Sequence, residues 1–112
     1  MEQQQKKEYK DFVTFEMTGS PSQVSNWPYK QDFQNDMLNW GFTHTTLTKE
    51  TDLLVAERED IGTGKWLKAK KYGIPIYTYK QVWEQKEKLY QKIIRNKKLG
   101  ILQKKILSGE ID

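Results

Sequence analysis

A lysine-rich stretch is the part of this sequence whose residue types and spacing most clearly indicate chemistry. Residues 63–76 read TGKWLKAKKYGIPI, and a short helix is expected from about Lys65 to Tyr72. The amino terminus of a helix carries a partial positive charge, and Lys65 adds a full charge at that end. Gly73 fits the left-handed position that ends a helix abruptly. The stretch therefore indicates a phosphate or a longer polyanion as ligand, and a solvated helix surface is the alternative.

Other phosphate-binding, metal-binding and catalytic patterns are not supported. Gly64-Lys65 resembles the end of a P-loop. That motif needs a glycine where Glu59 stands and a Ser or Thr where Trp66 stands, so we reject it. His44 is the only histidine and the chain has no cysteine, which makes a zinc site unexpected. Because no Ser-His-Asp or Cys-His set is evident either, we expect no catalytic residues, no metal, no cofactor and no enzyme activity.

The charges are unevenly distributed along the chain. Residues 1–60 carry six Lys/Arg and eleven Asp/Glu, a balance of −5, whereas residues 61–112 carry thirteen and four, a balance of +9. The basic half favours a polyanionic partner such as nucleic acid, although a solvated lysine-rich surface explains the charge equally well. The chain has no cysteine, no apolar run long enough to span a membrane and no apolar region near its amino terminus. We therefore expect an intracellular protein of the cytoplasm, nucleoid or nucleus that is not secreted.

The hydrophobic pattern predicts alternating strands and helices. Strands are expected at 12–17, 42–47, 53–56 and 74–78, and helices from Tyr29 to about residue 40, over 65–72, and from Tyr79 onward. This order, β-α-β-β-α-β-α, indicates an α/β fold with a parallel sheet covered on both faces. We expect a flexible amino-terminal segment at 1–10, a single domain at 11–88 and a basic helical extension at 89–112.

Four segments, in order along the chain, resemble the motifs of one domain family. They are Thr18-Gly19 after the first strand, LNWGF at 38–42, TKETDLLV at 48–55 and GKWLKAKKYGIPI at 64–76. With Trp83 in the last helix, they resemble a BRCT domain over roughly residues 10–88. The most similar members are the BRCT domains of NAD-dependent DNA ligases and of the clamp-loader (replication factor C) large subunit. The chain departs from their pattern in Thr63-Gly64, where Gly-Ser is usual, in a longer loop after Gly19, and in the extension after residue 88.

The resemblance implies a fold and a phosphate site. BRCT domains have a four-stranded parallel sheet flanked by three helices, and this chain would add a basic carboxyl-terminal helix. In that fold the turn after the first strand lies beside the start of the second helix. A threonine hydroxyl, a glycine N–H and a lysine would then converge on one phosphate. The residues implied are Thr18, Gly19, Thr63, Gly64 and Lys65.

Further basic residues are candidates for contact with a DNA backbone. Lys30 resembles a basic position used by the clamp-loader member, and Lys68 lies one turn after Lys65. Residues 80–105 hold nine Lys/Arg and two acidic residues, which suits a helix lying on duplex phosphates or a solvated outer helix face. The candidates on that segment are Lys92, Arg95, Lys97 and Lys98. Trp27 is able to stack on a base, but we expect it to fold back onto the domain.

The resemblance leads to a functional hypothesis and to alternatives. The hypothesis is a non-catalytic DNA-binding module of DNA replication or repair that recognises a 5′-phosphorylated end or nick. The main alternative is a BRCT protein–protein adaptor, including a reader of phosphopeptides, although such readers usually pair two BRCT units. A detached fragment of a ligase would be inactive, because the chain has no nucleotidyl-transfer motif. The expected partner is therefore DNA with a 5′-phosphate, or else a replication or repair protein.

Overall fold

The computed structural model describes residues 11–21 and 27–108, with side chains described as far as residue 98, so the expected flexible segment 1–10 lies outside it. Four parallel strands form one sheet in the order β2-β1-β3-β4. The strands are β1 (Val13–Thr18), β2 (Phe42–His44), β3 (Leu53–Ala56) and β4 (Ile76–Thr78). The helices are α1 (Lys30–Leu38), α2 (Gly64–Tyr72) and α3 (Tyr79–Ser108). The predicted α/β class, with a parallel four-stranded sheet and three helices, is confirmed.

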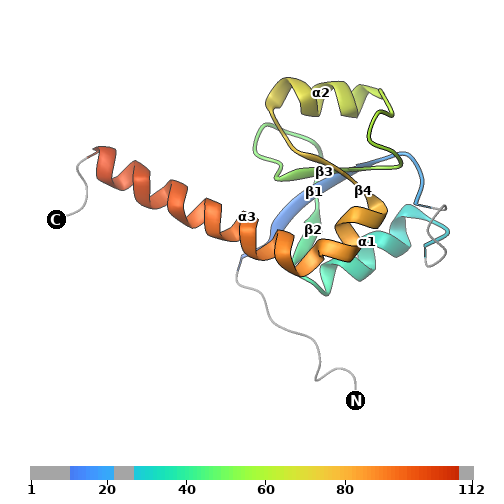
Figure 1. The fold of residues 1–112 in the computed structure, drawn as a ribbon, viewed down its shortest axis with the longest axis horizontal. Helices are drawn as coiled ribbons and strands as arrows, with labels where there is room; N and C mark the ends of the chain where they lie inside the picture. The colour runs from blue at the N-terminus through green and yellow to red at the C-terminus, as the bar shows by residue number, and fades with distance from the viewer. Residues whose placement is uncertain (1–10, 22–26, 109–112) are drawn as a thin grey trace, which may run out of the picture.

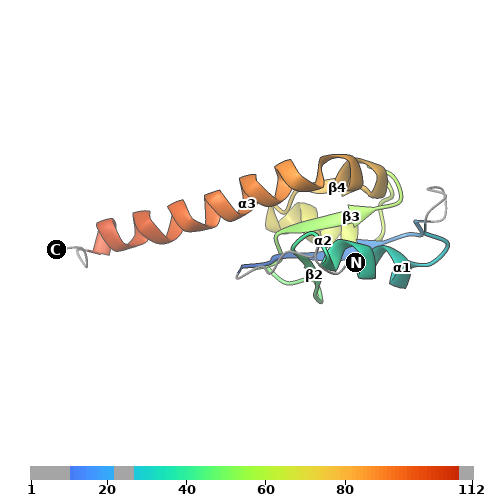
Figure 2. The same cartoon turned by 90° about the horizontal axis from the view of Figure 1, so that it is seen from below.

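Helices cover both faces of the sheet. α1 and α3 lie on one face and α2 lies on the other (Figure 1, and Figure 2 from below). Because all four strands are parallel, each helix that follows a strand begins at the carboxyl edge of the sheet. The turn after β1, the loop between β3 and α2, and the start of α3 therefore gather at this edge, and they bring several candidate residues with them.

The larger apolar core lies between the sheet and the pair α1 and α3. Every second residue of β1, from Val13 to Met17, points into it. Trp27 is fully buried there, with its ring edge-on to Phe33 at a centroid distance of 4.9 Å. The Trp27 indole N–H donates to Asp36 Oδ2 at 2.7 Å, which satisfies the polar atom of the buried ring. The expectation that Trp27 folds back onto the domain is confirmed.

The face of the sheet under α2 has a smaller apolar cluster and a polar strip. The cluster consists of Leu47, Leu54, Ala69 and Ile74. The remaining β1 positions on this face carry Thr14, Glu16 and Thr18. β1 is therefore apolar on one side and polar on the other, and the polar side ends at the carboxyl edge beside the start of α2.

Two strands are shorter than the sequence pattern predicts. β2 ends at His44 rather than Leu47, because the chain leaves the sheet and places Leu47 in the cluster under α2. β4 begins at Ile76 rather than Ile74, whose side chain is buried in the same cluster. In both places the burial of one apolar side chain against α2 replaces a strand position that alternation alone would assign.

α3 is one continuous helix of 30 residues. The predicted basic helix at the carboxyl terminus is its second half rather than a separate element. Apolar packing continues past residue 88, since Leu89 and Ile94 belong to the larger core. Beyond this point α3 projects past the sheet (Figure 1; Figure 2). Within the described part of the chain, no helix combines the length and the apolar character needed to cross a membrane.

Candidate functional site

Two threonines of the expected phosphate site meet in the structure. Thr18 ends β1 and Thr63 is the N-cap residue of α2, and their hydroxyl oxygens lie 2.6 Å apart. Thr63 Oγ1 also accepts the Trp66 N–H at 3.3 Å, which caps the helix. The Thr63 hydroxyl hydrogen is therefore left to donate to Thr18 or to a ligand oxygen. We call Thr18, Gly19, Thr63, Gly64 and Lys65 the candidate phosphate site.

Lys65 reaches from the first turn of α2 to the end of β1. Its Nζ donates to the Met17 carbonyl at 3.0 Å and lies 3.5 Å from Glu16 Oε2. The Lys65 side chain is 44% exposed, so it lies at the surface of the protein. Lys65 therefore stands beside Thr18, but it is engaged by a carbonyl and a carboxylate.

Glu16 and His44 form a polar pair that sequence reasoning did not identify. Glu16 Oε1 lies 2.6 Å from His44 Nε2 and accepts the Met17 N–H at 2.8 Å. Burial alone would raise the pKa of Glu16, but the Met17 N–H, His44 and Lys65 together hold that pKa below its ordinary value. Glu16 is therefore a carboxylate at neutral pH that competes with an anionic ligand for Lys65. The only signal in the sequence was a charged residue at the centre of an alternating strand.

Gly19 and Gly64 differ in whether the fold would accept a side chain at that position. Gly19 has a φ of 81°, and a Cβ there would lie 2.5 Å from Glu57 Cβ and 2.8 Å from Ile61 Cδ1. Gly19 is therefore required by the fold itself. A Cβ on Gly64 would meet nothing within 4 Å, so the fold would accept alanine at this position. In the first turn of α2 the Trp66 N–H is bound by Thr63, and the N–H groups of Gly64 and Lys65 have no acceptor within the helix.

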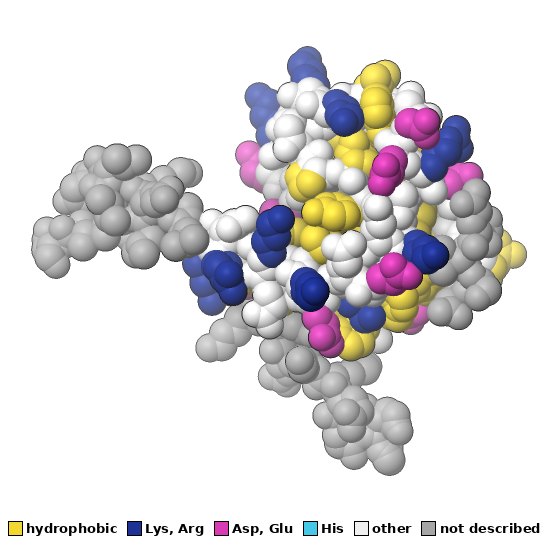
Figure 3. Space-filling view, in the orientation of Figure 1, with side chains coloured by type: hydrophobic (Ala, Val, Ile, Leu, Met, Phe, Trp, Pro, Cys, Tyr) yellow, Lys and Arg dark blue, Asp and Glu magenta, His cyan; other side chains and the backbone are white. Residues whose placement is uncertain are grey.

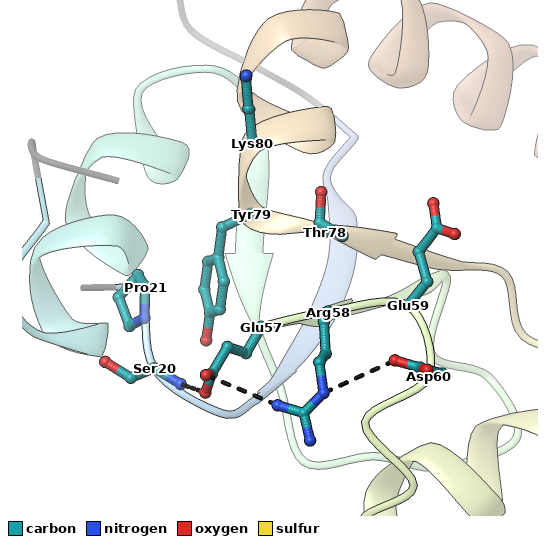
Figure 4. Close-up of a pocket in the computed structure, with 9 residues that line it drawn as sticks. All are labelled: Ser20, Pro21, Glu57, Arg58, Glu59, Asp60, Thr78, Tyr79 and Lys80. Atoms are coloured by element: carbon teal, nitrogen blue, oxygen red, sulfur yellow. Dashed lines mark hydrogen bonds and ion pairs between the residues drawn. The ribbon is translucent and has the colours of Figure 1, made fainter. Parts of the chain in front are cut away.

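A cleft of about 570 Å³ adjoins the candidate phosphate site at the carboxyl edge. Figure 4 shows Arg58 between Glu57 and Asp60, and its nitrogens lie 3.8 Å and 3.6 Å from the two carboxylates. Glu57 also accepts the Ser20 N–H at 3.0 Å. Positive and negative side chains in the cleft thus face each other, and the cleft lacks the excess of cations that an anion site needs.

Tyr79, the first residue of α3, forms the inner wall of this cleft (Figure 4). Its hydroxyl donates to the Gly19 carbonyl at 2.9 Å. Burial, together with the nearby carboxylates of Glu57 and Glu16, raises the pKa of the Tyr79 hydroxyl. Tyr79 therefore stays a neutral donor at physiological pH and fixes the turn that carries the candidate phosphate site.

Two further lysines named as DNA-backbone candidates lie on different faces of the molecule. Lys68 is exposed on α2, one turn after Lys65. Lys30 is the exposed first residue of α1, and α1 covers the face of the sheet opposite α2. Of these two lysines, only Lys68 extends the candidate phosphate site along the same helix.

The candidates on α3 lie at the amino edge of the sheet, away from the candidate phosphate site. Lys97 Nζ is 2.7 Å from Asp52 Oδ2 and donates to the Phe12 carbonyl at 3.2 Å, and both partners immediately precede strands. With a rise of about 1.5 Å per residue, Arg95 lies about 24 Å along α3 from Tyr79. Four of the predicted DNA-backbone residues therefore lie far from Thr18 and Lys65. They are Lys92, Arg95, Lys97 and Lys98.

Comparisons with known proteins do not assign the chain to a family. No family model, no curated protein and no solved structure matches it. Among the described residues, no group of three or more His, Cys, Asp or Glu side chains is arranged to hold a metal ion. A proposal of function therefore depends on the fold and on the geometry of the candidate residues.

Proposed function

We propose that this chain is a non-catalytic DNA-binding module of replication or repair that recognises a 5′-phosphorylated end or nick. The observation that carries the proposal is the pair of hydroxyls of Thr18 and Thr63, 2.6 Å apart at the amino terminus of α2. In this hydrogen-bonded pair one hydroxyl hydrogen lies between the two oxygens, which leaves the other free to donate to an oxygen of a phosphate. The dipole of α2 and the charge of Lys65 favour an anion at the same point.

The resemblance to BRCT domains supports this choice of ligand. The fold that the resemblance implies is a four-stranded parallel sheet with three helices, and this chain has that arrangement. The same topology brings Thr18 next to Thr63 although 45 positions separate them in the sequence. Gly64 has no side chain at the first turn of α2, and a helix N-terminus offers free backbone N–H groups to an anion.

Binding requires Lys65 to exchange its acceptors. Its ammonium group leaves the Met17 carbonyl and Glu16 and turns to the phosphate oxygens. Glu16 keeps the Met17 N–H and His44 as partners, so the buried carboxylate remains hydrogen-bonded. Specificity for a terminal phosphate comes from its extra negative charge, which outweighs the single carboxylate for Lys65.

The test is fluorescence anisotropy with a duplex that has a recessed 5′ end, compared with and without the 5′-phosphate. Lys65→Ala is measured beside Lys71→Ala, which removes an exposed lysine from the same helix outside the candidate phosphate site. Charge-assisted hydrogen bonds contribute about 1.5–3 kcal/mol, so we expect Lys65→Ala to lose about tenfold or more in affinity for the phosphorylated end. Lys71→Ala should keep the preference for the phosphorylated end.

Two results would contradict the proposal. If the wild-type protein binds both duplexes equally, the candidate phosphate site does not read a terminal phosphate. If it binds neither duplex, the protein–protein adaptor becomes the better hypothesis, and its partner would then be sought by pull-down with Lys65→Ala as the comparison.

A further inference from the structure

Three cations form an exposed row on the outer side of α3. Lys88, Lys92 and Arg95 follow one another at intervals of four and three residues, which places them on one helix face. With Glu87 and Gln91 they line a shallow depression of about 390 Å³. Figure 3 shows Lys and Arg side chains gathered where α3 leaves the body of the protein. We call Lys88, Lys92 and Arg95 the α3 ridge.

From the α3 ridge to the end of α3 at Ser108, every charged residue in the sequence is positive. From residue 88 to residue 108 the sequence has seven Lys/Arg and no Asp or Glu. Lys97 is neutralised by Asp52, whereas the three side chains of the α3 ridge are exposed. A run of cations at one helix face attracts a polyanion and repels another copy of the same face.

The apolar side of this helix is already used by the fold, and this limits what the α3 ridge can bind. Val82, Leu89 and Ile94 are buried in the larger core. A helix that lies on a membrane needs a free apolar face, and the centre of a protein–protein interface is rich in aromatic residues and poor in lysine. The α3 ridge provides neither an apolar face nor an aromatic residue. A nucleic-acid backbone needs only cations at suitable spacing.

The α3 ridge is held firmly and lies far from the candidate phosphate site. Leu89 and Ile94 pack into the core on the other side of the same turns, and Lys97 binds Asp52 just beyond them. α3 covers the face of the sheet opposite α2, and Arg95 lies about 24 Å along α3 from the carboxyl edge. One straight nucleic-acid backbone does not reach both places.

We propose that the α3 ridge binds the phosphate backbone of duplex nucleic acid separately from the candidate phosphate site, so that one protein molecule holds two nucleic-acid segments. The α3 ridge reads charge alone, and it therefore accepts any sequence and needs no end. The statement that two segments are held rests on the proposed function, whereas binding at the α3 ridge does not.

The first experiment measures binding of a covalently closed dumbbell duplex, which has no ends, over a salt series. The test variant is Lys88→Gln/Lys92→Gln/Arg95→Gln. The control, Lys49→Gln/Lys70→Gln/Lys71→Gln, removes the same charge from exposed positions elsewhere. Each phosphate contact contributes about 0.9 to the slope of log K against log salt, so the test variant should lower that slope by about 2–3. The control should lower it by less than half as much.

If the two triple variants lower the salt slope equally, the proposal is wrong, because binding of the dumbbell would then depend only on the net charge of the protein. Circular dichroism of both variants checks that α3 is still folded.

The second experiment asks whether two segments bind at once. A donor-labelled duplex with a recessed 5′-phosphate and an acceptor-labelled dumbbell are mixed with the protein, and energy transfer between them is recorded. We expect transfer with the wild type and none with the α3 ridge variant. If the dumbbell instead displaces the phosphorylated duplex, the two sites are not separate and the proposal is wrong. If the dumbbell binds through the α3 ridge but the protein shows no preference for a 5′-phosphate, the proposed function is wrong. The proposal that the α3 ridge binds duplex nucleic acid would still hold.

Discussion

At the carboxyl edge of the sheet the cation is held in place, whereas on the α3 ridge the cations project into solvent. Lys65 contacts the Met17 carbonyl and lies close to Glu16, and the hydroxyl beside it belongs to a hydrogen-bonded pair. Lys88 and Lys92 are exposed side chains on the outside of a helix. In the first arrangement a ligand would have to replace the acceptors that Lys65 already has, whereas in the second the cations are exposed to any anion.

This difference has consequences for specificity. A ligand of Lys65 must compensate for the lost contacts with the Met17 carbonyl and Glu16, and this requirement selects against weakly charged or misplaced anions. Exposed lysines adapt to many positions of a backbone, and their contribution falls steeply as salt rises. The preference for a phosphorylated end should therefore weaken less as salt rises than the contribution of the α3 ridge, which should be lost in high salt.

The largest effect is expected when the backbone at the candidate phosphate site is strained. Gly19→Ala puts a Cβ against Glu57 and Ile61 at a residue with φ of 81°. Left-handed backbone and overpacking together should lower the free energy of unfolding by about 2–5 kcal/mol. Urea denaturation measures this loss. Gly64→Ala is the matched control, since its Cβ meets nothing, and it should change stability by about 0.5 kcal/mol or less. Equal losses in the two variants would contradict this account of Gly19.

A smaller effect, a gain in DNA affinity, is expected from removing the carboxylate that competes for Lys65. Glu16→Gln keeps the size of the side chain and an oxygen that can accept the Met17 N–H. Affinity for the 5′-phosphorylated duplex should rise by about three- to tenfold, because Lys65 is freed from a neighbouring charge. Binding of the dumbbell to the α3 ridge should not change. A fall in affinity for the phosphorylated end would show that Glu16 positions Lys65 instead of competing for it.

The same carboxylate should make stability depend on pH in the acid range. The pKa of Glu16 is lower in the folded protein than in the unfolded chain, so the unfolded chain binds more protons as pH falls. Glu16 thus stabilises the fold fully above its unfolded pKa, near pH 4.3, and this stability is lost as pH falls through the lower folded pKa. Urea unfolding between pH 3 and pH 6 should show a shallower acid loss in Glu16→Gln than in the wild type. Parallel curves would mean that other carboxylates carry the acid loss.

The smallest effect is expected at the ion pair beside the α3 ridge. Lys97→Met removes the contact with Asp52, and because Lys97 is 41% exposed the loss of stability should be about 0.5 kcal/mol. The salt slope for the dumbbell should stay the same, because Lys97 already pairs with Asp52 and is not one of the three α3 ridge residues. If the slope falls by about 0.9 instead, Lys97 contacts a phosphate of the dumbbell.

Most of the fold could be predicted because local patterns agree with it. The alternation in β1, the Gly73 end of α2, and the apolar side of α3 are all short-range signals. The end of β2 was predicted less well, because Leu47 is buried against α2, which is distant in sequence. Such burial depends on how the elements pack, and no local window contains that information.

The candidate phosphate site was predictable only in part for the same reason. The parallel order of elements brings Thr18 to Thr63, and this follows once the topology is known. The partner of Glu16 is His44, 28 positions away, and that contact depends on strand register and on how the chain leaves β2. The ion pair of Lys97 with Asp52 likewise required the length and direction of α3, which the sequence left open.

The continuity of α3 bears on the shape of DNA that could occupy both places. α3 starts at Tyr79 beside the cleft and runs past the opposite edge of the sheet without a break. Duplex DNA is stiff over a persistence length of about 50 nm, so a short continuous duplex cannot curve around the domain from one face to the other. Substrates with a flexible joint, such as a gapped molecule, or loops long enough to bend back, should engage both places on one protein molecule. The local concentration of the second segment, and so the overall affinity, would then depend on the length of the joint or loop between the two segments.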